Sequence, residues 1–191
     1  MNLRVAVVDR TTVDADPEQL TAAERGALAR VTGARRRDEW IRGRLAIRRV
    51  LGDPEISMVI APDGAPRPVG GQPCSVSLSH DGEWIAVAVA SAGVRLGIDL
   101  CVRSHEVRLA RIMRWLDVRY GALDPVIVWT ALEAALKVRG LAIEALRDRA
   151  LEVRPDPEHD GAVIVRGLGD QLRVESREGR DFVVGWTSEA A

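Results

Sequence analysis

The chain has 191 residues, of which 47% are apolar, and it carries 27 basic against 28 acidic side chains. This composition excludes an intrinsically disordered chain, and a net charge of −1 argues against a dedicated nucleic-acid binder, whose domains carry a basic excess. The longest uncharged apolar stretch, residues 85–94, is far shorter than the ~20 residues that span a bilayer. The N-terminal residues do not resemble a signal peptide, and two cysteines are too few for a disulfide scaffold. We therefore expect a globular cytoplasmic protein that binds neither membranes nor nucleic acid.

In the first half of the chain, the residue pattern predicts one strand, two helices and a group of short strands. The expected strands are residues 3–8, 56–60, 75–78 and 84–90, and the expected helices are residues 17–31 and 35–51. Turns are predicted at Pro62-Asp-Gly64, Gly70-Gly71 and Asp81-Gly82. The sequence Thr21-Ala-Ala-Glu24 matches a capping box, which would place the start of the first helix as late as Ala22.

After Gly93 the same order of elements starts again. A strand is expected over residues 94–100, helices over 106–116 and 125–139, and further strands over 151–154, 162–165, 172–176 and 182–186. We interpret this as a duplicated α+β unit with lobes at 1–92 and 93–191, although no residue-level repeat is visible. A cleft between two similar halves is a natural binding site.

The expected helix over residues 126–138 is apolar nearly all round and contains only two charges, Glu133 and Lys137. Lys137 is also the single lysine among the 27 basic residues. The two charges are four residues apart and so lie on one face, where they form either a helix-stabilising pair on an exposed surface or part of a functional cleft. Because Thr130 is the only other polar residue nearby, the pattern favours the cleft.

An aspartate interrupts the apolar run Leu96-Gly-Ile-Asp99-Leu. Asp99 either caps a turn at a frayed strand end or is buried, and a buried carboxylate needs a charged partner or a metal ion. Gly97 would permit close approach of a ligand or of another segment. Together with Glu133, Asp99 would offer a hard cation two carboxylates, the usual pattern for Mg²⁺ held jointly by protein and substrate phosphates.

The motif Ser77-Leu-Ser79-His80-Asp81 closes a predicted strand before a tight turn. Ser79 and His80 can donate hydrogen bonds to phosphate, and a structural role is the alternative for His80. A Ser-His-Asp hydrolase is excluded, because neighbours in sequence cannot form the geometry of a catalytic triad and the chain has no G-x-S-x-G elbow.

The expected helix over residues 35–51 is dense in arginine, and Arg37, Arg44 and Arg48 share one face with Arg36 to one side. Such a run is either a solvated face or a surface for a phosphate-rich ligand, since arginine binds phosphate bidentately. RNA is an alternative ligand, but the aromatic residues are scattered rather than arranged for base stacking.

Five motifs, taken in order, resemble the 4′-phosphopantetheinyl transferases of the two-lobed surfactin-synthetase-activating type. They are RRRDEWIRGRLAIRRVL, DGAPRP, SLSHDGEW, LGIDL and WTALEAALKVRG. The resemblance implies a pseudodimer of two α+β lobes, monomeric, with the active site at their interface. It also implies the activity: Mg²⁺-dependent transfer of the phosphopantetheine arm of coenzyme A to a serine of an acyl or peptidyl carrier protein, as in fatty acid, polyketide and nonribosomal peptide biosynthesis.

The resemblance also implies roles for individual residues. Asp99 and Glu133 would bind Mg²⁺, Glu133 would act as the general base, and Lys137 would bind the pyrophosphate. The 3′-phosphate of coenzyme A would be held by Ser79 and His80, with Arg36, Arg44 and Arg67 assisting.

The chain departs from the family pattern at two positions. Cys101 stands where the motif Gly-Ile-Asp-x-Glu has its second acid, and Leu132 stands where a lysine commonly precedes the glutamate. Because a thiol is a poor ligand for Mg²⁺, we expect weaker metal affinity, and the missing lysine would lower the rate or alter carrier choice. The alternative is a degenerate family member that binds coenzyme A or a carrier protein without catalysis.

Overall fold

The structure is a computed structural model that describes residues 3–60, 66–70, 73–147 and 149–190. It is α+β and divides into two compact units, Met1–Val94 and Arg95–Ala191, close to the boundary expected after residue 92. The predicted turn at Pro62-Asp-Gly64 and the second half of Gly70-Gly71 lie outside the described residues. In the described part of the chain, no helix combines the length and the hydropathy needed to cross a membrane.

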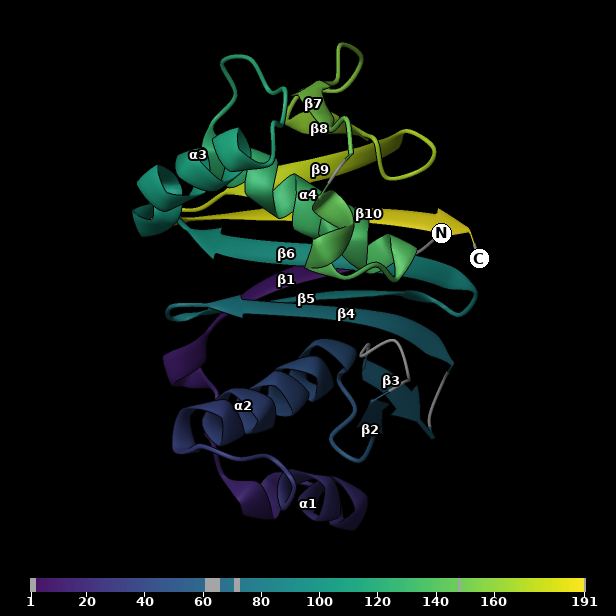
Figure 1. Ribbon diagram of the computed structural model, residues 1–191. Helices are drawn as coiled ribbons and strands as arrows, with labels where there is room; N and C mark the ends of the chain where they lie inside the picture. The colour runs from purple at the N-terminus through teal and green to yellow at the C-terminus, as the bar shows by residue number, and fades with distance from the viewer. Residues whose placement is uncertain (1–2, 61–65, 71–72, 148, 191) are drawn as a thin grey trace. The chain divides into compact units, whose positions relative to one another are not determined.

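The N-terminal unit consists of a three-stranded antiparallel sheet, a separate hairpin and two helices, as far as the described residues extend (Figure 1). Its elements are β1 (Arg4–Asp9), α1 (Ala22–Leu28), α2 (Ala34–Leu51), β2 (Ser57–Ile60), β3 (Pro66–Val69), β4 (Cys74–Asp81) and β5 (Trp84–Ser91). The sheet order is β1-β5-β4, and β2 pairs with β3. Helix α2 packs along the sheet, and α1 lies on the other side of α2 (Figure 1).

The first predicted helix, residues 17–31, is wrong in its extent. The capping box at Thr21 and Glu24 is confirmed, and α1 begins at Ala22 as it implies. The preceding residues, Pro17–Gln19, form a separate 3₁₀ turn capped by the Asp16 side chain. Strand β3 was not predicted, because Pro66 and Pro68 cannot donate ladder hydrogen bonds and hide a strand in the sequence pattern.

The C-terminal unit is a five-stranded sheet with two longer helices, again within the described residues. Its elements are β6 (Val94–Val102), α3 (Glu106–Trp115), α4 (Pro125–Arg139), β7 (Glu152–Pro155), β8 (Ala162–Arg166), β9 (Leu172–Glu178) and β10 (Phe182–Ala190), with 3₁₀ turns η3 (Arg103–His105) and η4 (Ile143–Leu146). The sheet order is β6-β10-β9-β8-β7. Helix α4 crosses one face of this sheet (Figure 1).

The two units repeat one order of elements. Over the described residues, each has a strand, then two α-helices, then four further strands. The strand order corresponds as well, because β1-β5-β4 in the first unit matches β6-β10-β9 in the second. The repeat that the residue pattern predicted is therefore present in the order of the elements.

Helix α4 is buried in the core of its unit because nearly all of its side chains are apolar. Asp124 caps its first turn ahead of Pro125, and Gly140 ends it with a left-handed φ of 63°. Strand β6 passes very close to α4 at Gly97, where an added Cβ would lie 1.9 Å from the carbonyl oxygen of Ala134. The absence of a side chain at Gly97 therefore allows the strand and the helix to meet at backbone distance.

Candidate active site

Three charged residues predicted from the sequence come together in the C-terminal unit. The Lys137 Nζ on α4 donates a hydrogen bond to Asp99 Oδ1 at 2.9 Å and another to the carbonyl oxygen of Ile98 at 2.8 Å. Asp99 on β6 is only 7% exposed, and it lies within the strand rather than at its end. The interpretation of Asp99 as a turn cap at a frayed strand end is therefore wrong, and the ammonium group of Lys137 compensates its burial.

The strand and helix periodicities explain this arrangement. Gly97, Asp99 and Cys101 alternate with their neighbours along β6 and so share one face of the strand. Gly97 meets the backbone of α4 at Ala134, which places Asp99 beside this part of the helix. Because Glu133 and Lys137 are one helical turn apart, both flank the same segment of β6. Lys137 makes its ion pair with Asp99 on the neighbouring strand, so it does more than stabilise its own helix.

The carboxyl group of Glu133 is perturbed by its surroundings. Burial raises the pKa of Glu133, the nearby charge of Asp99 raises it further, and Lys137 acts in the opposite direction. Two carboxylates thus compete for one ammonium group in a half-buried site. Such a site favours either a proton on Glu133 or an additional cation.

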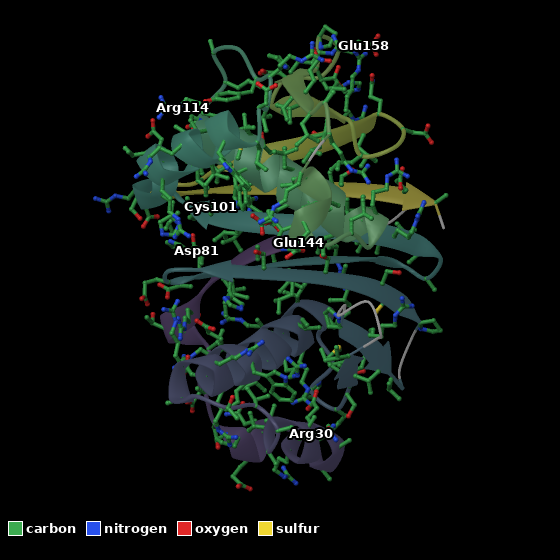
Figure 2. The ribbon with its side chains drawn as sticks, viewed as in Figure 1. Arg30, Asp81, Cys101, Arg114, Glu144 and Glu158 are labelled. Atoms are coloured by element: carbon green, nitrogen blue, oxygen red, sulfur yellow. The ribbon has the colours of Figure 1, made fainter. Side chains whose placement is uncertain are left out.

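Cys101 lies on β6 as well (Figure 2). By the alternation of the strand, it occupies the next position after Asp99 on the same face. Its side chain is buried against Leu109 and Val126, and its Sγ lies 3.7 Å from Nδ1 of His105. His105 was missed by the sequence analysis, although its spacing of four residues from Cys101 across the strand end is a signal that could have drawn attention to it. Leu132, the other departure from the family pattern, is fully buried in the core.

The residues predicted to hold a phosphate in the N-terminal unit lie in different surroundings. Ser79 and His80 are neighbours on β4, so their side chains point to opposite faces of the sheet. His80 is exposed and shares the face of Leu78, which packs toward α2, whereas Ser79 is buried. Arg67 is exposed on β3.

Arg36 and Arg44 on α2 differ sharply in exposure. Arg36 is exposed and has no partner among the described residues. Arg44 is 4% exposed, and its guanidinium lies 3.3 Å from the ring centroid of Trp40. Burial lowers the pKa of Arg44 to about 10, although Glu24 acts in the opposite direction. Within the described part of the chain, its Nε and Nη2 find no hydrogen-bond acceptor, so two donors of a buried cation are unpaired.

The other arginines of α2 contact the protein itself. Arg48 is buried and forms an ion pair with the buried Glu24. It also donates hydrogen bonds to the carbonyl oxygens of Gln19 (2.6 Å) and Ile56 (2.8 Å). Arg37 donates to the carbonyl oxygen of Leu28 at 2.8 Å. The interpretation of this helix side as a solvated face is therefore wrong for these residues, which hold α1 and the adjoining loops onto α2.

Replacing Arg48 with alanine should destabilise the N-terminal unit by about 3–5 kcal/mol, because the carboxylate of Glu24 would stay buried without its partner. Equilibrium urea unfolding of the full chain measures this cost. Arg30→Ala is the matched control, since Arg30 is exposed and should change stability by less than about 0.5 kcal/mol. Equal effects of the two substitutions would show that the buried ion pair contributes nothing.

Comparison with known proteins assigns no family to the chain: no protein-family model matches it, and a search of the curated proteins finds no match. The function must therefore be inferred from the chemistry of the residues described above and from the resemblance of the five motifs.

Proposed function

We propose that this protein is a cytoplasmic, monomeric 4′-phosphopantetheinyl transferase that moves the phosphopantetheine arm of coenzyme A onto a serine of an acyl or peptidyl carrier protein. The observation that carries the proposal is the cluster of Asp99, Glu133 and Lys137, which β6 and α4 bring together. The resemblance implies catalytic roles for Glu133 and Lys137 and a metal-binding role for Asp99 and Glu133. The repeated order of elements in the two units supports the further proposal of a pseudodimeric fold.

The donor set suits a magnesium ion. Asp99 and Glu133 supply carboxylate oxygens, and Mg²⁺ is typically bound by one or two carboxylates together with substrate phosphates and water. Burial raises the pKa of Glu133 most, and the charge of Asp99 raises it further, so a divalent cation between the two carboxylates would relieve both the cost of burial and their repulsion. When bound there, Mg²⁺ would neutralise the charge of the pyrophosphate. The residues present therefore fit the metal that the resemblance implies.

The chain's own residues then have distinct tasks. Glu133 accepts the proton of the carrier serine as the serine oxygen bonds to the phosphorus that carries the pantetheine arm. The bond from that phosphorus to the bridging pyrophosphate oxygen breaks, and the nucleotide part of coenzyme A leaves. Lys137 stabilises the charge that develops on the leaving phosphate. Its hydrogen bond to Asp99 already orients the ammonium group, so little reorganisation is needed during the reaction. A carboxylate with a raised pKa is a stronger base than an exposed one.

The remaining proposed contacts serve recognition. The unpaired donors of Arg44 support the binding of an anion such as the 3′-phosphate of coenzyme A, for which Arg36, Arg67, Ser79 and His80 are the other candidates. For the carrier protein, α3 offers the exposed apolar side chains Val107 and Trp115, 78% and 68% exposed. Its arginines, Arg108, Arg111 and Arg114, would complement an acidic helix of the carrier.

The proposal is tested by intact-mass spectrometry of a panel of acyl and peptidyl carrier proteins incubated with coenzyme A and Mg²⁺. We expect at least one carrier to gain a single phosphopantetheinyl group, and its serine-to-alanine variant to gain none. Binding of coenzyme A without a mass gain on any carrier would instead identify the degenerate, non-catalytic relative.

Cys101→Glu should lower the Mg²⁺ concentration needed for half-maximal transfer, because a third carboxylate would join Asp99 on the same face of β6. The measurement is the initial rate of carrier modification across a magnesium titration. Cys101→Ser is the control, since it removes the thiol without adding a carboxylate. A titration curve that coincides with that of the unsubstituted protein would contradict the placement of Cys101 beside the metal.

A further inference from the structure

We propose that Cys101 and His105 bind a thiophilic divalent cation of the zinc class. The Sγ of Cys101 and the Nδ1 of His105 are 3.7 Å apart. In a tetrahedral zinc site, bonds of about 2.3 Å to sulfur and about 2.0–2.1 Å to nitrogen place these two atoms roughly 3.6 Å apart. The two side chains are therefore already separated as two ligands of one ion are, and little movement is needed to bind it.

The local structure holds both ligands in place. Strand β6 ends at Val102, and η3 turns at once so that His105 comes back to Cys101. Arg103 fixes this turn, because its side chain pairs with Asp124 at 2.5 Å and with Glu178, and its backbone N–H donates to the carbonyl oxygen of Asp181 at 2.8 Å. Cys101 itself is packed among apolar side chains of the unit's core. A pair anchored in this way loses little entropy when it binds an ion.

Cys101 and His105 favour a different metal ion from the one proposed for Asp99 and Glu133. A thiolate is a soft ligand and imidazole a borderline one, and both prefer Zn²⁺ or Co²⁺ to Mg²⁺. Binding releases the thiol proton to solvent, since the thiolate is the form that coordinates the metal. Cys101 and His105 are two of the ligands of this site, and zinc completes its tetrahedral shell with further ligands, which can include water.

Titration of the metal-free full chain with Co²⁺ tests the proposal, because a cobalt–thiolate bond gives a charge-transfer band in the near ultraviolet. We expect one equivalent of Co²⁺ to produce the band, Zn²⁺ to abolish it, and a large excess of Mg²⁺ to leave it unchanged. Cys101→Ser should lose the band, whereas Cys74→Ser, which removes the only other cysteine, should keep it. His105→Gln should weaken cobalt binding at least about 10-fold, the loss expected even for groups that merely support a ligand.

Retention of the band in Cys101→Ser, its loss in Cys74→Ser, or its absence from the unsubstituted chain would overturn the proposal. Unchanged cobalt affinity in His105→Gln would also overturn it, because the thiol would then bind without the imidazole. Should Cys101→Ser fail to fold, the comparison of His105→Gln with Cys74→Ser still decides the question. The result is independent of the transferase assignment, since neither residue is required for the proposed transfer and no carrier or coenzyme A is present in the titration.

Discussion

Replacing Glu133 with glutamine should reduce the rate of phosphopantetheinyl transfer at least ~10²-fold, the usual contribution of a general base. Glutamine keeps the shape of the side chain but can neither accept the serine proton nor ligate a metal as a carboxylate does. The initial rate of carrier modification, followed by intact-mass spectrometry, gives the effect. Because burial and Asp99 raise the pKa of Glu133, the neutral amide should leave thermal stability unchanged or higher, so unfolding would not explain the loss.

Glu144→Gln is the matched control for this substitution. Glu144 is an exposed glutamate of η4 in the same unit, and its replacement should leave the transfer rate within about two-fold of the unsubstituted protein (Figure 2). Wild-type rates in Glu133→Gln would contradict the assignment of the base. Equal losses in both variants would show that the assay responds to surface charge rather than to the site.

Replacing Gly97 with alanine should destabilise the C-terminal unit by about 3 kcal/mol or more, at the upper end of the cost of overpacking. The added Cβ would lie 1.9 Å from the oxygen and 2.8 Å from the carbon of the Ala134 carbonyl, and backbone atoms of a buried helix cannot move aside as a flexible side chain can. Since α4 carries Glu133 and Lys137, the displaced helix should also lose transfer activity. Chemical unfolding and the carrier assay measure the two effects.

Gly26→Ala provides the comparison for Gly97→Ala. Gly26 lies in α1, and nothing stands within 4 Å of an added Cβ. Alanine should therefore raise stability there by up to about 1 kcal/mol, because glycine is a poorer helix former. An unfolding free energy for Gly97→Ala within about 0.5 kcal/mol of the unsubstituted protein would show that β6 and α4 are not in backbone contact.

Local patterns predicted most of the secondary structure. The apolar run of α4, its proline start and its glycine end gave the helix bounds that the structure has, Pro125–Arg139. Prediction failed at β3, where prolines interrupt the strand pattern. It also failed at Pro17–Gln19, a separate 3₁₀ turn that the pattern assigned to the following helix. It also failed for Arg48, because the burial of a charge depends on a partner, Glu24, that is distant in sequence.

The candidate site was partly predictable for a related physical reason. Asp99, Glu133 and Lys137 stand out because charges within apolar runs require compensation. Their partners do not follow from local patterns: Lys137 pairs with Asp99, 38 residues away, rather than only with the glutamate on its own helix. His105 lies in a short turn without periodicity, so its contact with Cys101 emerges only from the fold.

A crystal structure of the protein with coenzyme A and Mn²⁺, in place of Mg²⁺, tests the central claim most directly. We predict one anomalous-scattering peak bonded to the carboxylates of both Asp99 and Glu133 and to the pyrophosphate of coenzyme A, with the Lys137 ammonium in contact with the same pyrophosphate. A peak elsewhere, or a Glu133 carboxylate directed away from both the metal and the pyrophosphate, would contradict it.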